Sequence, residues 1–179
     1  MRIETLNSLP PDSLLIPYRD APAYTDGYSL DLPQSVSLAD YIAAFYTTPL
    51  FKLERLVLAL LVARPSTDAQ AQALARSAIG KFAAWTVEGR TENQILMCDF
   101  MKKTRSWLMC MPVPGATGTR ICFGSAIVPH HISADGHVHL GLGFHLLLGF
   151  HRLYSRALLQ SAARRLSRGM QQAGRLLFS

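Results

Sequence analysis

The sequence predicts an α+β fold in which an antiparallel sheet packs against a long C-terminal helix. Residues 81–128 alternate apolar and polar positions between short turns, which is typical of consecutive antiparallel strands. Residues 144–169 place apolar side chains at helical spacing. A sheet of meandering hairpins must hide its apolar face, and the long final helix is the obvious cover.

Length and composition fit one globular domain. The chain has 179 residues, of which 49% are hydrophobic and 17% charged, enough to bury a substantial core. We expect an extended N-terminal arm at 1–23, a single domain at 24–170 and a C-terminal tail at 171–179. The sequence shows no internal repeat.

Several features favour a cytoplasmic protein. The first fifteen residues include two acids and two prolines, where a signal peptide needs a basic patch and an apolar run. The apolar runs at 56–63 and 138–150 fall short of the roughly 18 residues that span a bilayer. Three cysteines without paired spacing do not form a secreted disulfide framework. We therefore expect no transmembrane segment.

The first half of the chain should hold one strand and up to three helices. Four prolines make the arm aperiodic, and residues 24–32 then alternate as a half-buried strand. Ser35 or Ser37 can cap a helix through residue 46. Pro49 suits the first turn of a second helix at 50–63. A third, Ala-rich helix is expected from the caps at 66–68 to about residue 79.

The second half should hold four strands and the long helix. A turn at Gly89–Arg90, another at 101–103 and a third at 114–118 separate the strands, which are expected at 81–88, 92–100, 104–113 and 119–128. A loop at 129–136 precedes a short edge strand at 137–140. The final helix is expected over 144–169.

These turns predict a register and therefore two faces of the sheet. If Thr104 opposes Phe100 and Val113 opposes Thr119, one face carries eight larger side chains: Ile95, Met97, Trp107, Met109, Met111, Ile121, Phe123 and Ile127. A slip of one residue would exchange the faces between strands. We expect this face to line a cavity, since methionine adapts to varied apolar ligands. The alternative is that it forms ordinary core beneath the helix.

The same register brings two polar or reactive pairs together. Asp99 would oppose Arg105, either as a device that fixes the register or as a polar anchor at a pocket mouth. Cys110 would oppose Cys122, either as two small buried hydrophobes or as a redox-sensitive dithiol.

All six histidines lie between His130 and His151. His137 and His139 would share one face of a strand, and His145 could join them, but a metal site needs a third or fourth ligand. Asp135 is the last acid in the chain. We predict no metal site and no cofactor.

The final helix carries the candidate polar groups of the cavity. Phe150 and Tyr154 belong to its apolar stripe, which His151 borders. His151 or Tyr154 could act as an acid or base, or simply pack. Neither a recognisable Ser or Cys nucleophile nor a second acid accompanies them.

The net charge of +6 is concentrated in this helix. Residues 1–135 contain twelve acids and twelve basic residues, whereas residues 136–179 contain six arginines and no acid. The basic face could meet anionic lipid headgroups weakly or simply be solvated. We predict no specific nucleic-acid binding, because no recognisable module or stacking-aromatic pattern is present.

Three motifs resemble a known family. These are DGYSLDLP at 26–33, CDFMKKTRSWL at 98–108 and GFHRLY at 149–154. With the order of elements, they resemble the helix-grip superfamily of START, polyketide-cyclase and pollen-allergen proteins, and more narrowly the domain-of-unknown-function family 2867. The resemblance implies a curved antiparallel sheet wrapped around the C-terminal helix, with a cavity between them. It implies no established activity.

The sequence supports three hypotheses. The first is a binding protein for a small apolar or amphipathic molecule, with Met97, Trp107, Met109, Met111, Phe123, Phe150, His151 and Tyr154 around the ligand. The second is a cyclase-like or hydrolytic enzyme that uses His151 or Tyr154. The third is an interaction protein that uses its basic helix.

Overall fold

A seven-stranded antiparallel sheet forms the centre of the molecule. The computed structural model describes residues 1–21, 23–128 and 142–176, except for the side chains of 57–59, 61–62, 142–148 and 170–176. The strand order is β1-β2-β7-β6-β5-β4-β3. The strands are β1 (Glu4–Thr5), β2 (Tyr24–Leu32), β3 (Lys81–Phe82), β4 (Trp85–Arg90), β5 (Gln94–Asp99), β6 (Thr104–Pro112) and β7 (Thr119–Ile127).

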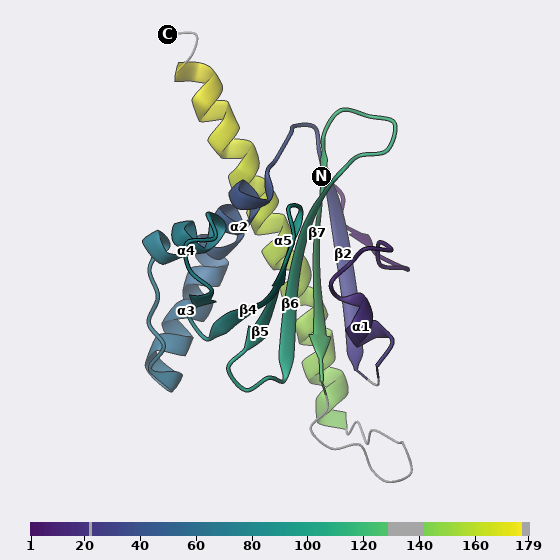
Figure 1. Cartoon of the computed structure of the whole chain (residues 1–179), viewed down its shortest axis with the longest axis vertical. Coiled ribbons are helices and arrows are strands. Elements are labelled where there is room, and N and C mark those ends of the chain that lie inside the picture. The colour runs from purple at the N-terminus through teal and green to yellow at the C-terminus, as the bar shows by residue number, and fades with distance from the viewer. Residues whose placement is uncertain (22, 129–141, 177–179) are drawn as a thin grey trace.

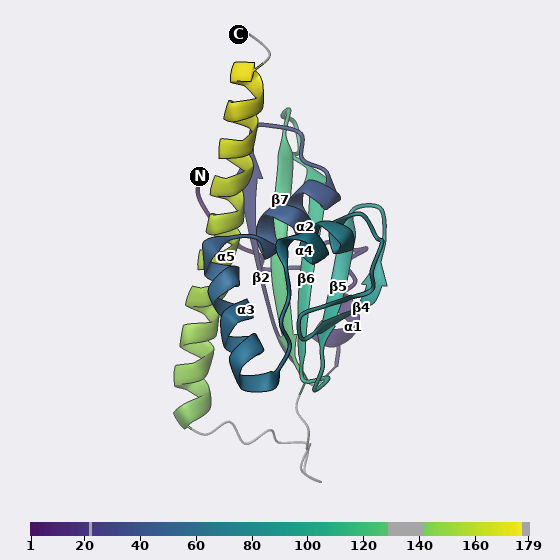
Figure 2. The same cartoon turned by 90° about the vertical axis from the view of Figure 1, so that its left-hand side faces the viewer.

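Helices and the N-terminal arm cover opposite faces of this sheet. The helices are α1 (Ile16–Arg19), α2 (Leu38–Tyr46), α3 (Pro49–Val62), α4 (Asp68–Ala75) and α5 (Leu142–Leu176). Figure 1 shows α2, α3 and α4 on one side of the strands, and α1 with the arm on the other. Turned by 90°, Figure 2 shows α5 running lengthwise beside α3. The expected α+β fold, a curved sheet against a long C-terminal helix, is confirmed.

Local capping explains where the early helices begin. The Ser37 hydroxyl accepts a hydrogen bond from the Asp40 backbone N–H at the start of α2. Thr67 and Gln70 form a reciprocal capping box at the start of α4. Pro49 is the first residue of α3, where its missing N–H is not needed. These helix starts agree with the sequence-based expectations.

The first hairpin differs from the expected continuous strand at 81–88. Ala83 has a φ of 51°, which turns the chain and separates β3 from β4. Gly89 and Arg90 do not form a turn but continue β4, with a bulge between Val87 and Gly89. Helix α4 ends at Ala75, four residues before the expected end.

The register of the two central hairpins differs from the expected one by one residue. Cys98 pairs with Arg105, and Pro112 pairs with Thr119. Each connecting loop is therefore one residue longer than the turn patterns predicted. In the first loop, Lys102 adopts a φ of 59°, and the Asp99 carboxylate accepts a hydrogen bond from the Lys103 N–H at 2.7 Å.

This slip moves Trp107, Met109 and Met111 to the face opposite the one expected. They pack with Leu15, Leu96, Cys122 and Ala126, and the arm residues Leu6, Leu9, Leu14 and Tyr18 cover them. Met97 and Phe123 remain on the face that meets the helices. The prediction that Trp107, Met109 and Met111 line a cavity beneath α5 was wrong, because side chains alternate between faces at each residue.

Gln94 attaches the arm to this outer face. Its Oε1 accepts hydrogen bonds from Trp107 Nε1 at 2.8 Å and from the Leu14 N–H at 2.9 Å. Its Nε2 donates to the Asp12 carbonyl at 2.8 Å. Gln94 is buried, so these bonds satisfy a polar side chain that would otherwise be costly to bury.

The inner face carries the larger core. Tyr41, Phe45, Tyr46, Phe51 and Phe82 pack in edge-on, tilted and stacked pairs with centroid separations of 4.8–6.4 Å. These contacts attach α2 and α3 to the sheet and leave a gap in the packing toward α5.

Cys110 and Cys122 do not face each other. Cys110 belongs to the inner core and pairs with Ile121, whereas Cys122 lies on the outer face and pairs with Met109. The expected cross-strand pair of Cys110 and Cys122 was wrong because the register of β6 and β7 is shifted by one residue. Burial raises the pKa of each thiol to about 12.

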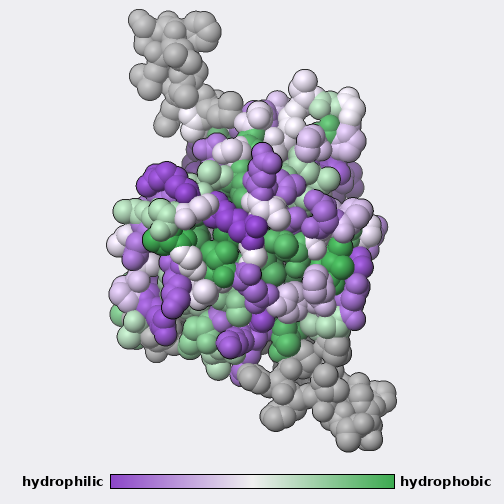
Figure 3. Space-filling view, viewed as in Figure 1, coloured by the Kyte–Doolittle hydropathy of each residue, from purple (hydrophilic) through white to green (hydrophobic). Residues whose placement is uncertain are grey.

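Polar and apolar side chains are interspersed on the surface, with the apolar ones gathered in a band across the middle of the face shown in Figure 3. Among the described residues, no helix combines the length and apolarity needed to cross a bilayer.

Candidate functional site

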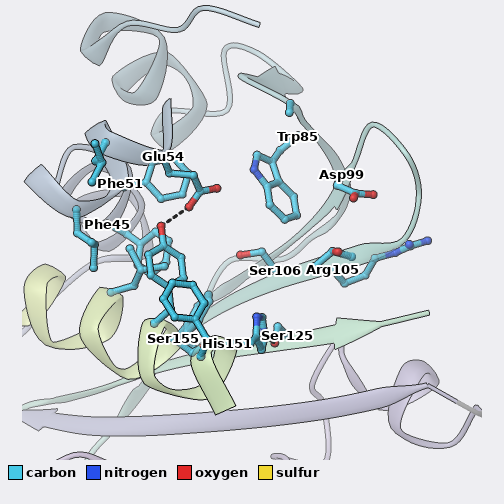
Figure 4. Close-up of a pocket in the computed structure, with 18 of the residues that line it drawn as sticks. Phe45, Phe51, Glu54, Trp85, Asp99, Arg105, Ser106, Ser125, His151 and Ser155 are labelled. Atoms are coloured by element: carbon cyan, nitrogen blue, oxygen red, sulfur yellow. Dashed lines mark hydrogen bonds between the residues drawn. The ribbon is translucent and has the colours of Figure 1, made fainter. Parts of the chain in front are cut away.

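A cavity of about 550 Å³ lies between the inner face of the sheet, α3 and α5. Figure 4 shows side chains from all three converging on it. It is lined mainly by apolar residues: Phe45, Leu50, Phe51, Leu53, Ala84, Trp85, Phe100, Phe123, Phe150, Tyr154 and Leu158. Its polar lining comprises Glu54, Asp99, Thr104, Arg105, Ser106, Ser125, His151 and Ser155.

The cavity opens where three elements leave large apolar side chains exposed. Leu53 of α3, Phe100 of the β5–β6 loop and Phe150 of α5 line the cavity, yet each exposes between 46% and 66% of its surface. An apolar mouth of this kind lets an apolar molecule enter without crossing a polar rim.

Glu54 and Tyr154 form the central polar pair of the cavity. The Tyr154 hydroxyl donates a hydrogen bond to Glu54 Oε2 at 2.5 Å, drawn as the dashed line in Figure 4. Burial raises the pKa of Glu54 above its ordinary value, because desolvation disfavours the charged carboxylate. Burial and the nearby carboxylate raise the pKa of Tyr154, so its hydroxyl stays protonated.

Two buried polar atoms of lining residues have no hydrogen-bond partner among the described residues: Trp85 Nε1 and Ser155 Oγ. In Figure 4 the indole nitrogen of Trp85 is turned toward Glu54, and its N–H partly opposes the effect of burial on the pKa of that carboxyl. Buried polar groups are rarely left unsatisfied in proteins. An occupant of the cavity would have polar groups available to it on two walls.

A second cluster of polar side chains, Asp26, Ser125 and His151, joins β2, β7 and α5 at the cavity wall. Ser125 Oγ lies 2.5 Å from Asp26 Oδ1 and 2.7 Å from His151 Nε2. An ionised Asp26 can only accept, so the Ser125 hydroxyl donates to it and accepts from the His151 Nε2–H. The Tyr28 hydroxyl also donates to Asp26, at 3.3 Å.

This order of hydrogen bonds differs from that of a serine hydrolase. There, the acid orients the imidazole through Nδ1 while Nε2 activates the serine. Here Asp26 bonds to Ser125 itself and lies 3.9 Å from the same His151 Nε2. With its proton directed to Asp26, Ser125 is not an activated nucleophile, and the group serves instead to orient His151 at the wall.

Arg105 does not pair with Asp99, as was expected, but has other partners. It forms an ion pair with Glu88 at 2.9 Å and donates to the Lys102 carbonyl at 2.6 Å. Its guanidinium also stacks over the Tyr18 ring, 4.8 Å from the centroid. The expected cross-strand pair of Asp99 and Arg105 was wrong because Cys98 holds that position in the register.

Of the eight residues expected around a ligand, four line the cavity: Phe123, Phe150, His151 and Tyr154. Met97 lies on the correct face but is fully buried in core. Trp107, Met109 and Met111 lie across the sheet.

Sequence reasoning missed Glu54, Trp85 and the Asp26–Ser125 pair. Glu54 was grouped with Lys52 and Arg55 as the polar start of a helix. Its position inside an otherwise apolar helix was the available signal. Asp26 and Ser125 are 99 residues apart and meet only through the register of β2 and β7.

The five arginines of α5 whose side chains the structure describes divide into two sets. Arg152 and Arg156 stack over Tyr24 and Tyr28 of β2, at 5.6 and 5.3 Å from the ring centroids. They therefore hold the helix against the sheet. The second set lines a separate surface groove beside α2: Arg164, Arg165 and Arg168.

Five of the six histidines have no described side chain: His130, His131, His137, His139 and His145. The expected edge strand at 137–140 also lies outside the described residues. Within the described part, no three His, Cys, Asp or Glu side chains gather as metal ligands do.

Comparisons of the chain with protein-family models, curated proteins and solved structures found no match.

Proposed function

We propose that this protein binds a small apolar or amphipathic molecule in the cavity between the sheet and α5. The observation that carries the proposal is a cavity of about 550 Å³ with a largely apolar lining and a few converging polar groups. Ligand pockets commonly occupy roughly 300–1,000 Å³ and have this character. The exposed apolar side chains at the mouth of the cavity support the same proposal.

We also propose a relationship to the helix-grip superfamily, and within it to the domain-of-unknown-function family 2867. The order of elements supports it: one strand, three helices, a run of antiparallel strands and a long helix. The position of the cavity between sheet and final helix is what that resemblance implies.

Native mass spectrometry of freshly purified protein tests the binding proposal. The expected result is a population heavier than the bare chain by the mass of a lipid or similar molecule. Ser155→Phe should fill part of the cavity and remove that population. Leu153→Phe is the matched control, since Leu153 is exposed on the same helix and does not line the cavity. A bare mass for the wild type would count against the proposal.

The two tryptophans allow a second, positional test. Trp85 lines the cavity, whereas Trp107 is buried across the sheet. A brominated fatty alcohol should quench Trp85 fluorescence in a Trp107→Phe variant. The same probe should leave Trp107 unchanged in a Trp85→Phe variant. Equal quenching of both would contradict binding in this cavity.

One observation supports the enzymatic alternative: Ser125 orients His151 at the cavity wall, where His151 could act on a bound molecule without Ser125 as nucleophile. Tyr154 is a poor base, because its raised pKa keeps it protonated. Hydrolysis of p-nitrophenyl butyrate tests His151 as the general base. Turnover that His151→Ala abolishes would support an enzyme, and turnover equal in both proteins would remove this alternative.

A further inference from the structure

Glu54 is the residue of the cavity whose charge is least compensated. It lies on α3 with its carboxylate facing Trp85 and the wall formed by α5 (Figure 4). It accepts a hydrogen bond from the Tyr154 hydroxyl, and the Trp85 indole N–H is turned toward it; both of these donors are neutral. A partly desolvated carboxylate normally has a cationic partner, because burying an unpaired charge is costly.

The basic side chains nearby are already engaged elsewhere. Lys52 and Arg55, its neighbours on α3, both pair with Asp68. Arg105 pairs with Glu88, and His151 bonds to Ser125. Within the part of the chain that the structure describes, no ion pair reaches Glu54. The ionised form of Glu54 therefore has no cationic partner among the side chains that the structure describes.

Aromatic rings surround the same space. Phe45 lies 5.0 Å from Phe123 and 5.8 Å from Phe51, measured between ring centroids. On α5, Phe150 and Tyr154 stack at 6.1 Å. Aromatic faces carry partial negative charge and attract cations within about 6 Å of the ring centroid. Quaternary ammonium groups are bound in other proteins by such aromatic surroundings.

We propose that the ligand of this cavity is an organic cation with an apolar body. The ammonium group pairs with the Glu54 carboxylate among the aromatic rings, and the apolar body fills the space toward Phe123 and Leu158. This inference rests on the proposed binding function and specifies its ligand class. An anionic amphiphile, such as a fatty acid anion, would instead place a second negative charge beside Glu54.

Three probes with the same alkyl chain test the ligand class: decyltrimethylammonium, decanol and decanoate. Calorimetric titration below the micelle concentration should show the cation binding wild-type protein on the order of tenfold more tightly than decanol. Decanoate should bind more weakly than decanol. Glu54→Gln removes the charge and keeps an acceptor for Tyr154. It should bring the affinity for the cation down to that for decanol and leave decanol binding unchanged.

Glu92→Gln is the control for the change in net charge. Glu92 is exposed in the β4–β5 turn and does not line the cavity. This variant should retain the full preference for the cation. Decanol binding also reports whether the cavity of each variant is intact.

The possible failures are distinguishable. If decanol or decanoate binds the wild type as tightly as the cation does, the ligand class is wrong and the binding function stands. If Glu54→Gln retains the preference, Glu54 is not the partner of the ammonium group. If none of the three probes binds the wild type, the proposed binding function fails together with the ligand class.

Discussion

The indole N–H of Trp107 donates to Gln94 Oε1 at 2.8 Å on the face of the sheet that is turned away from the cavity. The same Gln94 side chain bonds to the backbone of Asp12 and Leu14. One buried amide therefore connects strands β5 and β6 to the N-terminal arm. The outer face is thus a second core with its own polar anchor.

Replacing Gln94 should weaken that anchor. In Gln94→Leu, the Trp107 N–H and the Leu14 N–H lose their acceptor, at a cost of about 1–3 kcal/mol in unfolding free energy. Urea denaturation measures the loss, and hydrogen exchange should quicken at Leu14. Glu92→Ala, at an exposed position in the adjacent turn, should change stability by less than about 0.5 kcal/mol. Equal effects of the two substitutions would contradict the anchoring role.

Gly124 should not tolerate a side chain. A Cβ there would lie 2.8 Å from the Asp26 carbonyl oxygen and 2.9 Å from both Leu15 and Trp107. Gly124→Ala should therefore destabilise the protein by about 1–3 kcal/mol through overpacking. Gly149→Ala is the matched control, because that position in α5 meets no atom within 4 Å. It should stabilise the helix by up to about 1 kcal/mol. Thermal unfolding of both variants checks the pair.

The stability difference between Glu54→Gln and the wild type should depend on pH. The pKa of Glu54 is raised above 4.5 in the folded protein, so the native state favours the protonated carboxyl. Its contribution to stability is present below the unfolded pKa and is lost as the pH rises through the folded pKa. The unfolding free energy of the variant should therefore rise relative to that of the wild type as the pH rises above 4.5. Urea denaturation over a series of pH values measures this. A variant that loses stability relative to the wild type as the pH rises would contradict it.

The three free cysteines should differ in reactivity. Cys98 is partly exposed, whereas Cys110 and Cys122 are buried on opposite faces, with the pKa of each raised to about 12. Because the thiolate is the reactive form, Ellman's reagent should label Cys98 first in the folded protein. Cys98→Ser should remove the early phase. All three thiols should react after unfolding, and an internal disulfide between Cys110 and Cys122 would refute the assignment of their faces.

Ser125→Ala should disturb the wall of the cavity without abolishing the fold. It removes the hydroxyl that lies between Asp26 and His151 and should cost about 1–3 kcal/mol, since Ser125 is buried. Ser167→Ala, on the less buried part of α5, should cost less than about 0.5 kcal/mol. Chemical denaturation compares them. The histidine resonances of the Ser125 variant should also shift in NMR spectra, and unchanged His151 resonances would contradict the contact.

Much of the fold was predictable because the relevant forces are local. Caps such as Ser37 and Thr67 determine where helices begin, and alternation identifies strands β5, β6 and β7. The register was not predictable, because one extra residue in each loop leaves the alternation within every strand unchanged. Lys102 helps shape the first loop through its left-handed backbone conformation. No clear sequence pattern predicts that conformation at a lysine.

The candidate site was predictable only in part for a related reason. Phe150, His151 and Tyr154 follow one another along a helix, so their shared face can be read from spacing. Glu54 reaches them only through the packing of α3 beside α5. Asp26 and Ser125 meet through strand pairing over a long separation in sequence. Such contacts depend on the tertiary arrangement, which local patterns do not encode.

The coverage of the outer face by the arm also imposes an order on folding. Gln94 lies 80 residues after its partner Leu14, and most of the other surface that the arm covers comes later still. During synthesis, the arm leaves the ribosome before β5, β6 and β7 do, and it can dock only after they have emerged. Closing so long a loop is entropically unfavourable until those strands have paired. The arm is therefore synthesised before the strands that it covers, yet it is among the last segments to reach its native place.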